Sequence, residues 1–104
     1  MSGNNNDGVS STALGVNAGK TNSGDYLVAV GYNSAEANMA DNVVAIGNNA
    51  GNSNLYSNVN LIGKDAVATG NNQTVLSGST YQVLFNYNNI QLIEHMLHQM
   101  LMVL

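Results

Sequence analysis

A glutamate and two histidines near the C-terminal end are the residues most suggestive of metal chemistry. Glu94, His95 and His98 superficially match the zinc-binding helix of a metalloprotease. Zinc binding there needs two His residues four apart with a Glu between them. Here the His residues are three apart and Glu94 lies outside them. We therefore predict no metal site and expect both imidazoles to be structural or solvent-exposed, with a pH-dependent contact as the alternative.

The other polar residues do not form a recognisable catalytic set. Asp25, Asp41 and Asp65 are separated by a repeat rather than paired across a cleft, as glycoside hydrolysis requires. Ser and Thr are abundant, but no base stands near them to activate a nucleophile. The Gly-x-Asn turns lack the Lys of a phosphate-binding loop. The sequence therefore predicts no catalytic residue, no enzyme activity and no cofactor.

Three tyrosines are better candidates for contact with a ligand. They are Tyr26, Tyr32 and Tyr56, and Tyr32 directly follows a glycine at a predicted turn. Exposed aromatic rings beside Asn side chains are common on glycan-binding surfaces, because rings stack and amides adapt their hydrogen bonds. The alternative is that these rings cover the fold or seal a subunit boundary.

Charge and composition exclude several classes of partner. Charged residues make up 8% of the chain, the net charge is −4, and there are only two basic side chains. Nucleic acid is excluded because phosphate neutralisation needs many Lys and Arg. The N-terminus is polar and is not a signal peptide. The apolar run 90–104 is too short and too interrupted to span a membrane.

A repeat organises most of the chain. Gly15, Gly31, Gly47 and Gly63 lie sixteen residues apart, and each follows a short apolar stretch. Self-similarity at a fixed short period indicates a solenoid. Each unit should hold a strand of about five residues, a Gly-x-Asn turn, a second short strand and another polar turn. We divide the chain into a flexible lead-in at 1–10, a β-roll at 11–80, a cap or connector at 81–89 and a helix at 90–104.

The strands of this repeat are apolar on both faces, since side chains alternate along a strand. The large aliphatic residues directly before the glycines should stack inside the coil: Leu14, Val30, Ile46 and Ile62. The opposite face must then meet another surface, and the economical partner is a second copy of the chain. The residues expected at that interface are Leu27, Ala29, Val43, Ala45, Val59 and Leu61.

The glycines and the Asn or Asp residues two positions later have a structural explanation. Both residue types supply the backbone angles that a tight corner needs. The structural turn residues are Gly15, Gly31, Gly47, Gly63, Asn17, Asn33, Asn49 and Asp65.

The C-terminal segment has helical spacing. Asn88 and Asn89 are plausible N-caps, and apolar residues follow at alternating spacings of three and four, typical of coiled-coil a and d positions. These residues are Ile90, Ile93, Leu97, Met100 and Leu104. We expect an oligomerisation helix or one that docks on other virion or surface proteins, with a plain buried helix as the alternative. The stretch 81–87 is expected to be a further strand or a cap.

The units Leu27–Ala35 and Val43–Gly51 resemble the YadA-like head repeat of trimeric autotransporter adhesins and the related repeats of bacteriophage tail fibres and giant-virus proteins. The likeness covers about two-thirds of the chain, from Ser11 to Gly78. It implies an all-β fold, a left-handed parallel β-roll of four to five 16-residue coils, with three chains side by side and a coiled coil after the head. The signal peptide and membrane anchor of that family are not recognised here.

Two functional hypotheses follow from the resemblance. The first is a structural and attachment protein, a homotrimeric segment of a virion fibre or spike that contacts surface glycans. The second is the head fragment of a bacterial trimeric surface adhesin, so the expected location is the virion surface or the cell exterior. Ice binding needs regular Thr arrays, and the column Thr21, Ala37, Ser53, Thr69 is too irregular to favour it.

Overall fold

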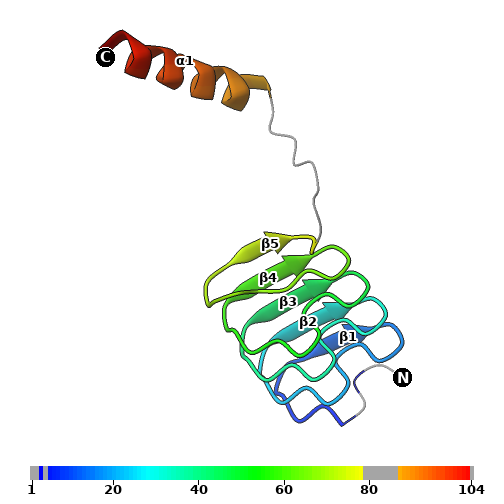
Figure 1. Cartoon of the computed structure of the whole chain (residues 1–104). Helices are drawn as coiled ribbons and strands as arrows, with labels where there is room; N and C mark the ends of the chain where they lie inside the picture. The colour runs from blue at the N-terminus through cyan, green and yellow to red at the C-terminus, as the bar shows by residue number, and fades with distance from the viewer. Residues whose placement is uncertain (1–2, 4, 79–86, 104) are drawn as a thin grey trace.

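The chain forms a parallel β-solenoid of about four turns, followed by one helix (Figure 1). The computed structural model describes residues 3, 5–78 and 87–103. Five strands form one sheet in sequence order, and each pairs in parallel with the next. The strands are β1 (Thr12–Leu14), β2 (Leu27–Val30), β3 (Val43–Ile46), β4 (Val59–Ile62) and β5 (Thr74–Leu76), and the helix is α1 (Tyr87–Val103).

The register of the sheet follows the repeat of the sequence. Leu14 lies beside Val30, and Val30 beside Ile46, so paired residues across the first three strand pairs are sixteen apart. The last pair departs from this offset, because Ile62 lies beside Leu76, fourteen residues later. Strand β5 is a short last strand, and the coil that leads to it has lost two residues.

The interior of the coil is narrow and is filled by the residues that alternate inward along each strand. Leu27, Val43 and Leu61 are at most 1% exposed, and the alanines between them are fully buried. The opposite wall approaches so closely that a Cβ added at Gly51 would stand 3.1 Å from the Ala45 Cβ and 3.2 Å from a Leu61 methyl. From β2 and β3 this lumen admits one alanine and one branched aliphatic residue each, and from β4 it admits Val59 and Leu61.

The corner after each strand uses unusual backbone angles. Gly47 has φ +130°, and a Cβ there would lie 2.8 Å from the carbonyl carbon of Gly63 in the next coil. Two positions later, every turn residue takes the left-handed region that Asn and Asp tolerate. The φ values are 60° for Asn17, 55° for Asn33, 59° for Asn49 and 60° for Asp65.

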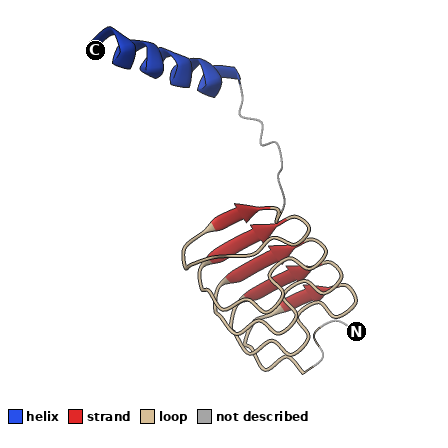
Figure 2. Cartoon of the chain, viewed as in Figure 1, coloured by secondary structure: helices blue, strands red, loops and turns tan. Residues whose placement is uncertain are grey.

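Two expectations about the coils are corrected. Within the described residues each coil contributes one strand of three or four residues, and the far side of the coil consists of turns rather than a second strand (Figure 2). The described part of the lead-in is also not free. Gly3 donates its backbone N–H to the Ala18 carbonyl at 2.7 Å, and Asp7 donates to the Asn22 carbonyl at 2.8 Å. These residues already stack on the first full coil.

Helix α1 begins earlier than its sequence pattern suggests. It starts at Tyr87, so Asn88 and Asn89 lie inside the helix and do not cap it. The expected strand or cap at 81–87 falls, apart from Tyr87, outside the described residues, as does Leu104. No helix in the described ranges is long and apolar enough to cross a membrane.

Candidate interaction surfaces

The outward face of the sheet carries a continuous column of aliphatic side chains. Leu14 is 67% exposed, Ile46 39% and Ile62 41%, and Leu76 is similarly accessible. The strand register places each of these residues directly beside the next, so they form an uninterrupted line across all five strands. We call this line the outer aliphatic column, and its members are Leu14, Val30, Ile46, Ile62 and Leu76.

This arrangement reverses the expected facing of the strands. The residues predicted to contact a second copy are instead the core of the single chain, at 0–1% exposed: Leu27, Ala29, Val43, Ala45, Val59 and Leu61. The large residues expected inside are on the surface. The physical reason is the width of the lumen. The far wall at Gly51 comes within contact distance of Ala45 and Leu61, so the inward positions of β2 and β3 combine one leucine or valine with one alanine.

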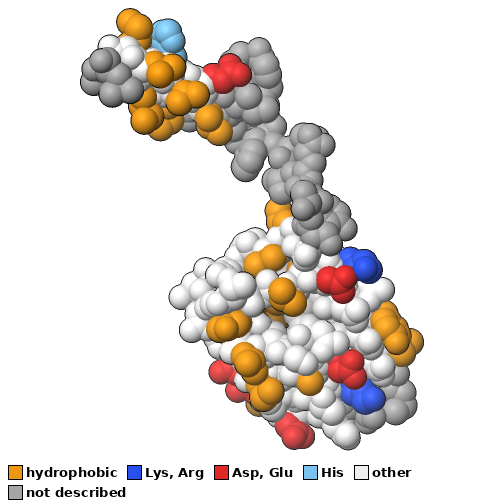
Figure 3. Space-filling view, viewed as in Figure 1, with side chains coloured by type: hydrophobic (Ala, Val, Ile, Leu, Met, Phe, Trp, Pro, Cys, Tyr) orange, Lys and Arg blue, Asp and Glu red, His pale blue; other side chains and the backbone are white. Residues whose placement is uncertain are grey.

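A second outward column runs parallel to the first and is less apolar. Val28 and Val44 are followed by Asn60, whose amide donates to the Thr74 hydroxyl at 3.2 Å. Charged side chains are few on the roll, and the space-filling view shows hydrophobic groups on its surface with some acidic and basic side chains among them (Figure 3). The sheet therefore offers an apolar surface bordered by uncharged polar groups and a few charged ones, among them Asp25 and Asp41 before β2 and β3 and Lys64 after β4.

Helix α1 presents further apolar side chains to solvent. Ile93, Leu97 and Met100 are 57–66% exposed, and Met96, Leu101 and Met102 are as accessible. The predicted interface residue Ile90 lies within the helix, but its side chain falls outside the described part. In the described part of the chain the helix contacts none of the five strands, so the alternative of a helix buried on the roll is not what the structure shows.

The histidines of this helix are placed on its surface. His95 Nε2 lies 3.0 Å from the Gln99 amide nitrogen, one helical turn later. Both His95 and His98 are exposed. Across the described residues no group of three His, Cys, Asp or Glu side chains is arranged to hold a metal ion.

The three candidate tyrosines are not brought together. Tyr26 and Tyr32 stand at opposite ends of β2 and are both more than half exposed. Tyr56 lies two coils further on and is only partly exposed. It lines a cavity of about 120 Å³ together with residues of the same corner and of the next coil. The structure therefore contains two exposed rings and one ring at a cavity, rather than one aromatic site.

A line of asparagines inside the second corner was not singled out for function. Asn38 is fully buried, and its Nδ2 donates to Asn22 Oδ1 at 2.7 Å and to the Ala40 carbonyl at 2.7 Å. Its Oδ1 accepts the Asn54 Nδ2 at 2.9 Å. This asparagine ladder, Asn6, Asn22, Asn38 and Asn54, satisfies backbone groups that the tight corner would leave unpaired. Its signal in the sequence is the sixteen-residue spacing.

A small charged feature lies at the end of the last full coil. The Lys64 ammonium stands 3.0 Å from Asp65 Oδ2, and the Asn49 amide donates to Asp65 Oδ1 at 3.3 Å. The hydrogen bond from Lys64, and then that from Asn49, lower the pKa of the Asp65 carboxyl below its ordinary value. Both partners of the ion pair are exposed, so its contribution to stability is small.

Comparison with known proteins gives no functional assignment, so the functional argument rests on the structure of the chain. No protein-family model matches the chain, and neither curated proteins nor solved structures give a significant match.

Proposed function

We propose that this chain is a structural and attachment protein, a trimeric β-roll segment of a virion fibre or spike that contacts surface glycans. Its place would be the virion surface or another extracellular surface. The left-handed coil and the three-fold arrangement come from the resemblance to adhesin and fibre head repeats. Self-association is supported by the exposed apolar side chains on the outward face of the solenoid.

The observation that carries the proposal is the outer aliphatic column. Five large aliphatic side chains stand in line on an already folded sheet, and the chain has a second apolar face that is fully used as its core. Exposed apolar surface that is contiguous and rimmed by polar groups is typical of a protein interface. Packing this column against its copies would remove it from water.

The helix supports the same proposal independently. Ile93, Leu97 and Met100 follow the spacing of a coiled-coil seam and are exposed in the single chain. Two heptads are marginal as an isolated helix, so the helix gains most if its partners are already held together by the roll. We therefore assign the roll as the main interface and the helix as an auxiliary one.

Attachment rests on the exposed rings. Tyr26 and Tyr32 both stand on corners outside the sheet face, where an assembled roll would leave them accessible. Each has a matched partner on which to test binding, because Asn42 and Asn48 occupy the same positions one coil later. A glycan array probed with the chain and with Tyr32→Ala would show loss of a bound glycan if the ring stacks on it.

The decisive measurement is the mass in solution, by light scattering behind a sizing column. Four chains would be compared: the unaltered chain, Ile46→Asn on the column, Leu97→Asn on the helix, and a chain ending at Gly78. Full burial of an aliphatic side chain is worth about 1.5–3 kcal/mol, so the part of Ile46 that is exposed is worth about 1 kcal/mol per copy.

The expected result is a trimer for the unaltered chain and for the chain ending at Gly78, with dissociation at micromolar concentration in Ile46→Asn. If the trimer persists in Ile46→Asn but is lost in Leu97→Asn, the main interface is formed by the helix and not by the roll. A folded monomer in all four chains would overturn the trimeric proposal.

A further inference from the structure

Each coil presents the same three hydrogen-bonding groups to the next coil at its second corner. The Lys20 carbonyl accepts the Ala37 N–H at 2.8 Å, the Asn22 Oδ1 accepts the Asn38 amide at 2.7 Å, and the Ser23 N–H donates to the Asn38 carbonyl at 2.9 Å. A two-residue unit, Ala37-Asn38, thus satisfies two acceptors and one donor of the coil beneath it.

The next coil repeats this contact with different residues. The Glu36 carbonyl accepts the Ser53 N–H at 2.7 Å, and the Asn38 Oδ1 accepts the Asn54 amide at 2.9 Å. The Met39 N–H donates to the Asn54 carbonyl at 3.0 Å. The conformation is also repeated, since Ala37 has φ 58° and Ser53 has φ 56°.

Among the described residues, the same three groups of the following coil receive no hydrogen bond from the coil after it. They are the Asn52 carbonyl, the Asn54 Oδ1 and the Leu55 N–H. The Asn54 Oδ1 accepts only the N–H of Tyr56 in its own corner, at 3.2 Å. Asn54 is 6% exposed, whereas Asn22 and Asn38 are fully buried. A nearly buried carboxamide therefore offers an acceptor to the place where a fifth asparagine of the ladder would bind.

The cause is the two-residue shortening of the last coil. Ala66 and Asn71 hold the two ends of its corner, by bonds to the N–H groups of Gly51 and Ser57. Only four residues connect them, where six connect the same points one coil earlier. Thr69, which stands in the column of Ser53, donates its N–H to the Gln73 side chain at 2.9 Å instead.

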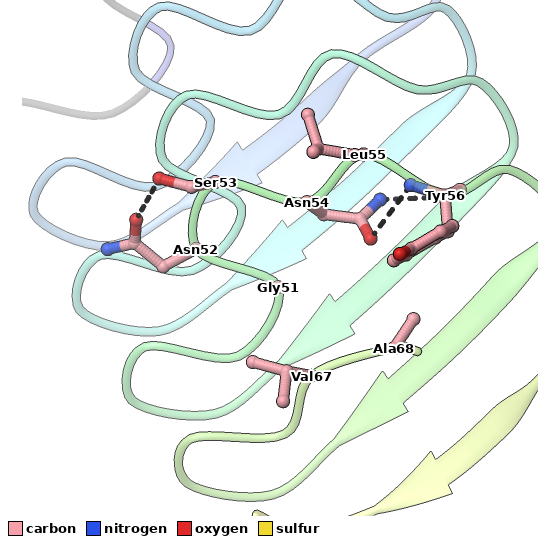
Figure 4. A pocket seen from close by; sticks show the side chains of 8 residues that line it. All are labelled: Gly51, Asn52, Ser53, Asn54, Leu55, Tyr56, Val67 and Ala68. Atoms are coloured by element: carbon pink, nitrogen blue, oxygen red, sulfur yellow. Dashed lines mark hydrogen bonds between the residues drawn. The ribbon is translucent and has the colours of Figure 1, made fainter. Parts of the chain in front are cut away.

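The shortened corner leaves the 120 Å³ cavity open. It is lined on one side by residues 51–56 and on the other by Val67 and Ala68. In the close view, the Asn54 carboxamide stands between its own corner and these two residues of the next coil (Figure 4). The apolar groups of Val67 and Ala68 would contact the stem of an entering side chain.

We propose that this cavity binds an asparagine-bearing turn of a protein partner. The ligand is a two-residue unit in which an N–H donates to the Asn52 carbonyl, a carboxamide donates to Asn54 Oδ1, and a carbonyl accepts from the Leu55 N–H. Glycine suits the residue before the asparagine, because the filled corners need a positive φ there. The site is separate from the outer aliphatic column and does not depend on the proposed trimer.

The three-group pattern favours a peptide over an acetamido sugar. An acetamido group has one N–H and one carbonyl, so a sugar would have to meet the second acceptor with a hydroxyl placed outside this arrangement. A Gly-Asn unit supplies both donors and the acceptor, in the arrangement that the chain itself uses twice. Leaving a polar group of such a site unpaired is costly, and this cost provides the discrimination.

The test is an NMR titration of the full chain with the capped peptide Asn-Gly-Asn-Leu. We expect saturable movement of the Leu55 amide and the Asn54 side-chain amide signals, with affinity of about 1–10 mM for so small a ligand. The amides of Ser23 and Met39, which are already bonded, should stay in place as internal controls. The matched control peptide, Asn-Gly-Asp-Leu, places a carboxylate against the Asn54 acceptor and should bind at least tenfold more weakly.

Two variants close the cavity in different ways. In the first, residues 67–70 are replaced by the six residues of 51–56, which restores the sixteen-residue coil; the Leu55 and Asn54 amide signals should then no longer move with the peptide, while the thermal midpoint rises. In the second, Ala68→Leu fills the cavity and should abolish binding with little change in the midpoint.

An unmoved Leu55 amide, equal binding of the two peptides, or binding retained by a folded filled variant would each overturn the proposal. Movement of the Leu55 amide by N-acetylglucosamine in place of the peptide would assign the site to a sugar and overturn the peptide ligand.

Discussion

The inner face of the five-stranded sheet and the outer aliphatic column are both apolar but differ in the size of their side chains. Strands β2 and β3 each place one alanine and one leucine or valine inward and β4 places Val59 and Leu61, whereas the outer aliphatic column consists of Leu, Ile and Val throughout. Hydrophobicity alone does not distinguish these faces. Size does, because the wall opposite Ala45 approaches to the distance of a single methyl contact. In so narrow a coil the smaller apolar face is the core and the larger one is available for other chains.

The largest contrast between the faces is expected at neighbouring positions of β4. Leu61→Ala removes a fully buried side chain and should lower the free energy of unfolding by about 2–5 kcal/mol. Ile62→Ala, one residue later, should cost less than about 1 kcal/mol in the monomer and show its effect as weaker assembly. Denaturant unfolding at several protein concentrations separates the two. Equal, concentration-independent losses would contradict the contrast.

Overpacking tests the width of the lumen directly. Ala45→Leu adds three carbons against Gly51 and beside Leu61, which already fills the same inward column one coil later, and should cost about 1–3 kcal/mol or more. The control is Val44→Leu on the outer face, for which we expect a change below about 0.5 kcal/mol. Thermal unfolding followed by circular dichroism measures both. A tolerated Ala45→Leu would mean that the coil can widen, and the size argument would fail.

Asn60 interrupts the second outward column after Val28 and Val44, so replacing it with an apolar residue would extend the apolar surface. Asn60→Val should tighten assembly by about threefold to tenfold, since it continues the line of Val28 and Val44. Asn60→Ser keeps the position polar and serves as the control. The dissociation constant from sedimentation equilibrium is the readout. An unchanged constant would place the interface away from this column.

The smallest effect concerns the exposed ion pair. Because the pKa of Asp65 is lowered in the folded chain, its contribution to stability is present above the ordinary carboxyl range. That contribution is lost as the pH falls through the folded-state pKa. Lys64→Met should raise this pKa, measured by NMR titration of the carboxyl carbon. The pKa should rise less in Asn49→Gly, which keeps a residue that tolerates the left-handed φ. An unmoved value in Lys64→Met would show that the amide alone sets it.

The repeat could be predicted because the glycines lie sixteen residues apart, and this spacing equals the offset between paired residues of neighbouring strands. The shortened β5 and the existence of a C-terminal helix followed from the same kind of pattern. The facing of the strands could not be predicted from hydrophobicity, because both faces are apolar. The small residues of the far wall, such as Ala50 and Gly51, indicate a narrow lumen and could have identified the inward face of the strands.

Two further features could not be predicted from the sequence pattern. The far side of each coil was expected to be a strand, yet its left-handed residues make it a chain of turns. The cavity beside Asn54 depends on two missing residues, so it becomes visible only when the hydrogen bonds of successive corners are compared. The predictions of trimerisation and glycan contact remain predictions.

The sixteen-residue offset shared by the first three strand pairs has an evolutionary consequence. A duplication or deletion of sixteen residues among these coils restores the same strand register and the same asparagine ladder, so the number of coils can change without a new kind of contact between coils. A change of any other length breaks the asparagine ladder. The length of the solenoid can therefore change in steps of one strand spacing, about 4.8 Å, as coils are gained or lost.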